Sequence, residues 1–398
     1  MTYFDALETR SADAREADQL QAFQAALRVA AAAPAGKNLR GVSVQSLGDL
    51  ARLPVTRKSD LVARQQAQPP LGGFAAANIS HYFQSPGPIY EPGGASADWF
   101  RLGRFLHASG VSAADIVQNC FSYHLVPAGM MFESAARAVG ARVLPAGTGQ
   151  TDLQVRAARD IGCTTYAGTP DFLKVILDKA DEQGVALKFA RAVVGGGALF
   201  PSLRQDYADR GITTRQCYAT ADLGNIAYET DALEGMVTDE GVIVEIVRPG
   251  TGDPVPHGEV GEVLVSNLNA DYPLIRFATG DLSAVLPGVS PCGRTGLRIR
   301  GWLGRADQAT KIKGMFVRPE QVAELVARHP EIARARVVAA REGEMDSMTV
   351  RIETRASNPQ LYEASVLEVL KLRGRIELVP PGSLPNDGKV IDDTRSYG

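Results

Sequence analysis

Residues 304–314 read GRADQATKIKG, and this stretch decides which fold we expect for the chain. It places Arg305 and Asp307 directly before two lysines, Lys311 and Lys313. A loop of this composition is often an exposed segment with a local salt bridge. Arginine can also donate bidentately to a ribose or a phosphate, and an aspartate at a domain boundary can act as a hinge. The motifs on either side decide between the two interpretations.

Two flanking motifs favour a nucleotide site. Upstream, RFATGD ends at Asp281, and downstream, PNDGK ends at Lys389. A carboxylate after a glycine can accept two hydrogen bonds from a ribose diol, and an accessible lysine can serve as a point charge for an α-phosphate. Each motif alone also fits an ordinary turn or a solvated lysine. In this order, the motifs predict a nucleotide bound between a large domain and a small lid domain.

Composition narrows the classes of partner. The chain has 398 residues, with 45% hydrophobic and 22% charged, which is typical of a soluble globular protein of two or three domains. A net charge of -3 and the lack of a long apolar run indicate neither a nucleic-acid nor a membrane partner. Four scattered cysteines suit a reducing compartment, and no secretory signal is visible. We therefore expect a cytoplasmic protein.

The pattern along the chain predicts an α/β fold. Residues 11–70 are expected to be helical, and 97–215 alternate between helices and short apolar strands, as in a doubly wound mixed sheet. Residues of about 235–303 are β-rich and predict a β subdomain. We expect a large N-terminal domain over 1–303 and a small, mobile α+β lid domain over 304–398, with its hinge near Asp307.

Taken in register, these motifs resemble the acyl-adenylate-forming superfamily of acyl-CoA synthetases, luciferases and nonribosomal-peptide adenylation domains. Four segments most resemble the phenylacetate–CoA ligase family: DLARLPVTRKSDL at 49–61, GTGQTDLQ at 147–154, GTP at 168–170 and YPLIRF at 272–277. The resemblance covers about residues 45–398. It implies ATP (bound as AMP after the first step), Mg²⁺ and CoA as cofactors, a small carboxylic acid as substrate, and a homodimer as the assembly.

The resemblance also implies a role for individual residues. Those expected to bind the nucleoside are Gly195, Gly196 and Gly197 along the adenine, Tyr218 near the base, Asp281 on the ribose hydroxyls and Arg305 on the ribose or phosphate. Those expected to serve the reaction are Thr220 at the α-phosphate, Asp222 on magnesium, Lys389 as the adenylation lysine and Asp307 as the pivot of the small domain. Residues 121–124 fall where the acyl pocket begins.

The phosphate loop departs from the family pattern. The aligned stretch reads QSPGPIYEP at 84–92, where Ser85, Gly87 and Pro92 remain and Glu91 stands in place of the lysine. Proline has no N–H to offer a phosphate, and a carboxylate repels one. Two milder departures are Asp222, one methylene shorter than the usual glutamate, and Leu199 in place of an acid.

Three functions remain open from the sequence. The first is ATP-dependent activation of a small, aromatic-type carboxylic acid to acyl-AMP, followed by thioester formation with CoA. The second is a catalytically weakened homologue that binds AMP, acyl-adenylate or acyl-CoA as a sensor or partner protein, suggested by the altered loop at 85–92. The third is an adenylating enzyme whose acceptor is a carrier-protein thiol or an amine. The sequence does not identify the acid.

Overall fold

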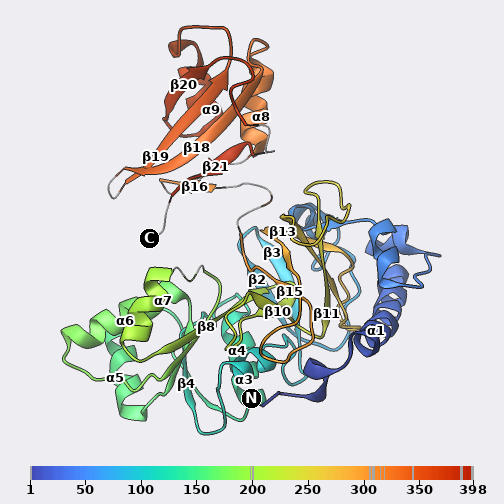
Figure 1. The fold of residues 1–398 in the computed structure, drawn as a ribbon, viewed down its shortest axis with the longest axis vertical. Helices are drawn as coiled ribbons and strands as arrows, with labels where there is room; N and C mark the ends of the chain where they lie inside the picture. The colour runs from blue at the N-terminus through green and yellow to red at the C-terminus, as the bar shows by residue number, and fades with distance from the viewer. Residues whose placement is uncertain are drawn as a thin grey trace. The chain divides into compact units, whose positions relative to one another are not determined.

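The structure, a computed structural model, describes residues 2–197, 199, 201–303, 306, 310–313, 315–317, 319–342, 345–385 and 389–395. Contacts divide the chain into two compact units, Met1–Leu303 and Gly304–Gly398 (Figure 1). Each unit has its own hydrophobic core. No helix in the described part of the chain combines the length and the apolar character needed to cross a membrane.

A nine-stranded mixed sheet forms the centre of the first unit. In spatial order its strands are β14 (Val285–Leu286), β15 (Arg298–Ile299), β10 (Met236–Thr238), β9 (Gly224–Tyr228), β8 (Thr213–Thr220), β7 (Arg191–Val194), β6 (Thr165–Gly168), β4 (Ile116–Asn119) and β5 (Arg142–Pro145). The strands from β5 to β8 run parallel, and those from β8 to β14 pair antiparallel. The predicted alternation of helices and strands therefore produces a parallel half sheet.

Helices cover both faces of the parallel half (Figure 1). They are α3 (Gly103–Ala108) and α4 (Ala128–Ala138) on one face, and α5 (Thr151–Ile161), α6 (Pro170–Glu182) and α7 (Pro201–Asp209) on the other. Successive side chains of β7 point to opposite faces of the sheet. Val193 packs with α3 and α4, whereas Ala192 and Val194 pack with α5 to α7. Such strands are buried on both faces, as a doubly wound sheet requires.

A second sheet has the order β1–β13–β12–β11, with β1 (Thr56–Arg57), β13 (Phe277–Ser283), β12 (Gly261–Asn267) and β11 (Val242–Val247). The strands β11, β12 and β13 pair antiparallel, and β1 joins β13 in parallel. The β-rich residues from 236 to 299 are thus shared between this sheet and the antiparallel half of the nine-stranded sheet. A separate hairpin is formed by β2 (Ile79–Ser85) and β3 (Ile89–Gly94).

The N-terminal segment packs on the second sheet. It contains α1 (Ala12–Ala32), α2 (Leu61–Ala67) and the short 3₁₀ helices η1 (Ala6–Thr9), η2 (Pro34–Leu39), η3 (Leu47–Arg52) and η4 (Lys58–Asp60). Buried Arg276 anchors it: its guanidinium donates to the carbonyls of Ala51 and Leu53 and to Glu245. This anchor holds β1 beside β13 and fixes where the following residue, Lys58, must lie.

The second unit is a small α+β domain. Its four-stranded sheet has the order β20 (Arg375–Val379), β19 (Met345–Glu353), β18 (Arg334–Glu342) and β21 (Ile391–Asp393). The helices α8 (Pro319–Arg328) and α9 (Gln360–Leu370) pack against this sheet in one core, together with the hairpin of β16 (Thr310–Ile312) and β17 (Met315–Val317). The predicted fold class, mixed sheets in a large domain and a small α+β domain, is confirmed.

Candidate active site

A glycine turn follows β7 at the edge where the parallel strands of the first unit end. Ligands of such sheets bind beyond these carboxyl ends. Gly196 has φ +70°, and a Cβ added at Gly195 would lie 2.9 Å from the Cys217 sulfur. Phe121 follows β4 at the same edge, and its ring would lie 3.8 Å from a Cβ at Gly196. A side chain at position 195 would collide with Cys217, and the φ of Gly196 favours glycine.

Hydrogen bonds connect Tyr218, Thr279, Asp281 and Trp302, which we call the ribose end of the candidate site. The Tyr218 hydroxyl donates to Asp281 Oδ2 at 2.8 Å and lies 3.0 Å from Thr279 Oγ1. The Trp302 indole N–H donates to the other carboxylate oxygen at 3.1 Å. Asp281 is 8% exposed. The predicted ribose acceptor thus lies beside the predicted base-stacking tyrosine, and two donors already hold its carboxylate in one orientation.

We call Lys58, Glu91 and Asp222 the phosphate end of the candidate site. Its contacts differ from those of the ribose end. Lys58 Nζ lies 2.5 Å from Asp222 Oδ2, an ion pair between residues 164 apart in the sequence. Glu91 lies on β3, on the side of the strand that also carries buried Ile89, and it is fully buried. Among the described residues, no group hydrogen-bonds to either oxygen of Glu91 or to Asp222 Oδ1. This end therefore holds two buried carboxyl groups and one lysine.

Burial and charge act together on Glu91. Burial, and next the nearby charge of Asp222, raise the pKa of the Glu91 carboxyl to about 7, while Ser85 and Lys58 oppose the shift. Ser85 acts on the Glu91 carboxyl through both its side chain and its backbone. Both carboxyls, after burial itself, also raise the pKa of Tyr272. These mutual effects show that Glu91 and Asp222 belong to one electrostatic cluster.

The donor set of the phosphate end fits a divalent cation that also binds phosphate. Buried carboxylate oxygens without partners are unfavourable unless a cation or a donor satisfies them. Mg²⁺ prefers oxygen ligands and is usually held by one or two carboxylates together with substrate phosphates. The described residues contain no group of three or more His, Cys, Asp or Glu side chains that could hold a metal alone. The chain thus fits a cation that arrives with a nucleotide.

The remaining residues of the altered loop lie at the tip of the β2–β3 hairpin. Ser85 ends β2, and Gly87 lies in the turn before β3 begins at Ile89. A Cβ at Gly87 would come 2.7 Å from the Ile89 side chain, so the turn requires glycine there. Thr220 ends β8, and its hydroxyl caps the next turn by accepting from the Leu223 N–H at 3.2 Å.

Three predicted residues belong to the second unit. Arg305 and Asp307 lie outside the described residues. Lys389 lies two residues before β21, its side chain is 55% exposed, and its Nζ lies 3.3 Å from Asp392 Oδ1. Its adenylation role stays a prediction.

Two cavities bear on where an acid could bind. One, of about 570 Å³, is lined mainly by aromatic and polar side chains, including Phe83, Trp99, Tyr123 and Glu133. Tyr123 belongs to the stretch expected to begin the acyl pocket, and neighbouring Phe121 stacks on Phe132 with ring centroids 4.2 Å apart. His124 from the same stretch is exposed.

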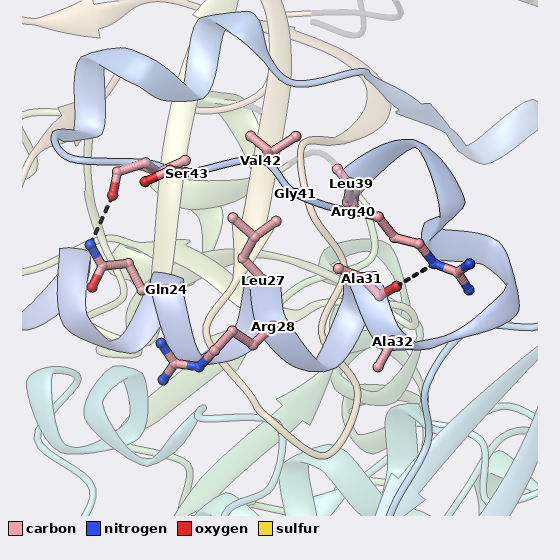
Figure 2. A pocket seen from close by; sticks show the side chains of 11 residues that line it. Gln24, Leu27, Arg28, Ala31, Ala32, Leu39, Arg40, Gly41, Val42 and Ser43 are labelled. Atoms are coloured by element: carbon pink, nitrogen blue, oxygen red, sulfur yellow. Dashed lines mark hydrogen bonds between the residues drawn. The ribbon is translucent and has the colours of Figure 1, made fainter.

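The second cavity, of about 530 Å³, lies between α1 and residues 39–44 (Figure 2). Gln24 and Arg40 bridge its walls through hydrogen bonds to the carbonyls of Val44 and Ala31. None of the predicted site residues lines it. We therefore place the candidate site at the strand ends and not here.

Sequence reasoning missed the parts of the site that come from distant segments. Lys58 was used only as part of the N-terminal segment resembling the ligase family, and Trp302 was not singled out. One signal was present: an acid at the position of the phosphate-loop lysine predicts that a cation must come from elsewhere. The sequence could not say that Lys58 supplies it.

Comparison with known proteins also relates this chain to AMP-binding enzymes. Residues 100–270 match the family described as AMP-binding enzyme. The phenylacetate-coenzyme A ligase of Thermus thermophilus is 27% identical over 328 residues, covering 78% of this chain and 73% of that protein. The Escherichia coli protein of the same name is 28% identical over 380 residues, covering 87% and 85%.

Among solved structures, 2-hydroxyisobutyryl-CoA ligase in complex with 2-HIB-AMP and CoA is similar with a TM-score of 0.71. The identity is 23%, and the match covers 98% of this chain and 91% of that one, so it shows a shared fold. The sequence relatives and the family match confirm the resemblance drawn from the motifs. The chain is similar to phenylacetate–CoA ligases over most of its length and contains a segment that matches the AMP-binding enzyme family.

Proposed function

We propose that the protein activates a small aromatic carboxylic acid with ATP and transfers the acyl group to CoA. In the first step, a carboxylate oxygen of the acid attacks the α-phosphorus, and the bond to the β-phosphate oxygen breaks, releasing pyrophosphate. In the second step, the CoA thiolate attacks the acyl carbon, AMP leaves, and the thiol proton passes to solvent. The observation that carries the proposal is the ribose end, where the hydroxyl of Tyr218 on β8 donates to the carboxylate of Asp281 on β13.

The nucleoside half of the site is assigned to residues of the first unit. Asp281 accepts from the ribose hydroxyls, because a carboxylate is a strong acceptor for a vicinal diol. Tyr218 packs beside the base, and the backbone of Gly195, Gly196 and Gly197 lies along the adenine. Arg305 remains a proposed contact of the ribose or phosphate.

The reacting half is assigned to Thr220, Lys389 and the phosphate end. Thr220 and the Lys389 ammonium stabilise negative charge that develops on the α-phosphate. When bound, Mg²⁺ supplies positive charge that neutralises and orients the triphosphate. Asp307 is the proposed pivot about which the small domain rotates, so that Lys389 leaves before CoA reacts.

The class of acid follows from the relatives and from the lining of the site. The sequence relatives are named phenylacetate-coenzyme A ligases. Phe121, stacked on Phe132 and next to the glycine turn, offers an aromatic surface to a ring. The sequence relatives are named as ligases, which also favours an enzyme over a sensor protein.

The two half reactions separate the proposed roles in one experiment. Pyrophosphate release and acyl-AMP formation are measured with ATP, Mg²⁺ and a panel of aryl acids that includes phenylacetate. We expect Lys389→Gln to slow adenylation by roughly 10²- to 10³-fold, the size typical of losing one donor to a developing charge. Thioester formation from supplied acyl-AMP and CoA should persist. Lys371→Gln, which alters another exposed lysine of the second unit, serves as the control.

The outcome that contradicts the proposal is equally specific. If no acid supports pyrophosphate release above background, or if Lys389→Gln and Lys371→Gln behave alike, the assignment of the first step is wrong. If acyl-AMP forms but CoA does not react with it, only the acceptor is wrong.

A further inference from the structure

Arg101 is a largely buried arginine that the proposed reaction leaves unused. It lies between β3 and α3 with a φ of +62°, and its side chain is 16% exposed. Its guanidinium Nε donates to Asp239 Oδ1 at 3.1 Å, and the side chain of Asp239 is fully buried. Because the guanidinium is a planar, rigid fork, this ion pair also fixes the direction of its other N–H groups.

Those other N–H groups bind the segment that carries two proposed site residues. Arg101 Nη2 donates to the carbonyl of Leu223 and, at 3.2 Å, to that of Asn225. Residues 221–223 form the short turn between β8 and β9, so Leu223 is its last residue. Hydrogen bonds from a charged donor are stronger than those from a neutral one. Arg101 therefore holds the end of this turn directly.

The turn is also bound to the backbone next to Arg101. The Asn225 backbone N–H donates to the Phe100 carbonyl at 2.8 Å, and its side-chain amide donates to the Arg101 carbonyl at 3.3 Å. A Cβ added at Gly224 would lie 2.6 Å from the Phe100 carbonyl oxygen, so this close approach requires glycine. Side-chain and backbone contacts thus attach the turn to the same short segment.

These attachments act directly on Thr220 and Asp222. The Leu223 N–H donates to Thr220 Oγ1 at 3.2 Å, and Asp222 immediately precedes Leu223 in the turn. In so short a turn, a displacement of the Leu223 backbone moves both side chains. A misplacement of about 1 Å at a reacting centre can lower a rate by about 10²-fold.

We propose that Arg101 is a positioning residue for adenylation, which holds the turn so that Thr220 and Asp222 face the phosphates of ATP. The inference rests on the proposed function, because that function assigns these two side chains to the reacting half of the site. Arg101 acts through the turn and not on the substrate. Its loss should therefore affect the rate of adenylation more than the binding of the nucleoside.

Arg104 provides a matched control. It donates to Asp239 Oδ2 at 3.4 Å, and its other N–H groups donate to Asp5 at 2.6 and 3.1 Å. Arg101→Lys and Arg104→Lys both keep a positive charge near the same buried aspartate. A lysine at position 101 lacks the fork that reaches two carbonyls. The two variants therefore differ in whether the turn is held.

Gly241→Ala displaces Arg101 without changing any charge. The added Cβ would lie 2.4 Å from Arg101 Cδ, so the arginine side chain must shift. This variant tests the same contact when the guanidinium itself is still present.

The experiment combines pyrophosphate release at saturating ATP and acid with AMP binding by calorimetry. Arg101→Lys should lower kcat by roughly 10- to 100-fold, the size typical of losing a group that orients a functional side chain. Gly241→Ala should lower kcat in the same direction by a smaller factor. Arg104→Lys should stay within about threefold of the wild type in kcat, and all four proteins should bind AMP within about twofold in affinity, because neither quantity depends on the turn.

The stoichiometry of AMP binding separates positioning from folding, since an unfolded fraction lowers stoichiometry and kcat together. If Arg101→Lys and Arg104→Lys lose kcat equally, Arg101 is only a structural residue, and the proposed function survives. If Arg101→Lys does not fold, Gly241→Ala decides, and an unchanged kcat in that variant overturns the inference. A wild type that binds AMP but releases no pyrophosphate with any acid contradicts the proposed function itself.

Discussion

The ribose end and the phosphate end of the candidate site use buried carboxylates in opposite ways. At the ribose end, both oxygens of Asp281 accept hydrogen bonds, from Tyr218 and from Trp302. At the phosphate end, both oxygens of Glu91 lack a described partner although this side chain is the more deeply buried. The same chemical group is therefore satisfied by the protein in one place and left unsatisfied in the other.

The difference indicates which part of a nucleotide we expect each end to bind. A carboxylate already held by neutral donors can exchange them for ribose hydroxyls at little cost, since hydrogen bonds are exchanged for hydrogen bonds. A carboxylate pair with one lysine is stabilised only when a proton or a cation arrives. Under the proposed function, the ribose end is formed in advance, whereas the phosphate end is completed by the ligand that binds there.

The largest expected effect is a pH dependence of stability that comes from Glu91. Its pKa is about 7 in the folded protein against an ordinary 4.5, so the folded state binds more protons between these values. The free energy of unfolding should fall as pH rises through this window, by about 3 kcal/mol in total, and the stabilisation is complete below about pH 4.5. Urea unfolding at pH 5 and pH 8 without metal ions measures it.

Glu91→Gln is the comparison protein for this measurement. The variant should lose most of the fall in stability, because the amide does not titrate. Asp98, whose pKa burial raises to about 6, contributes in the same direction to both proteins and cancels in the difference. Equal pH dependence of the two proteins would show that Glu91 does not carry the effect.

The next effect in size concerns AMP binding at the ribose end. Asp281→Asn should weaken AMP and ATP alike, by roughly 10- to 100-fold, because a hydrogen bond to a charged acceptor is worth about 1.5–3 kcal/mol. Glu91→Gln should leave AMP affinity unchanged. Calorimetry on both variants tests the comparison. A variant of Asp281 that weakens ATP but not AMP would contradict the division into two ends.

Removing the lysine of the phosphate end should lower stability by a smaller amount. Lys58→Gln leaves Asp222 without its cation, and we expect a loss of about 1–2 kcal/mol because the lysine is partly exposed. Mn²⁺ should restore more stability to this variant than to the wild type. Arg52→Gln, which removes an ion pair whose arginine is 83% exposed, should change stability by less than about 0.5 kcal/mol. Similar losses in both variants would argue against an important role for Lys58.

The smallest effect is expected for Trp302→Phe. The change removes one donor from Asp281 while keeping an aromatic ring, and a ribose hydroxyl can take the vacated oxygen, so AMP affinity should change by less than about threefold. The chain has two tryptophans, Trp99 and Trp302. The change in tryptophan fluorescence when AMP binds should therefore largely disappear in the variant. A fluorescence change that persists would place the response at Trp99.

Much of the fold could be predicted from local patterns. The strands at 116–119, 142–145 and 191–194 and the helices at 128–138 and 151–161 follow from short apolar runs alternating with amphipathic segments. The strand β1 and the hairpin β16–β17 were not predicted, because their two or three residues carry too little periodicity. The expected β subdomain is divided between two sheets, because strand partners depend on connections that local patterns do not encode.

The sequence by itself determined the resemblance to phenylacetate–CoA ligases and the motifs expected to form the nucleotide site, since these lie within short stretches such as 276–281 and 385–389. The resemblance also implied that Glu91 stands in place of a lysine. Only the tertiary structure decided what that replacement means, because the outcome depends on residues far apart in the chain. The parallel pairing of β1 with β13 brings Lys58 to Asp222, and Glu91 is buried on β3 of the β2–β3 hairpin. The sequence shows which residues are charged. Packing decides which groups surround each charge and how much water remains in contact with it.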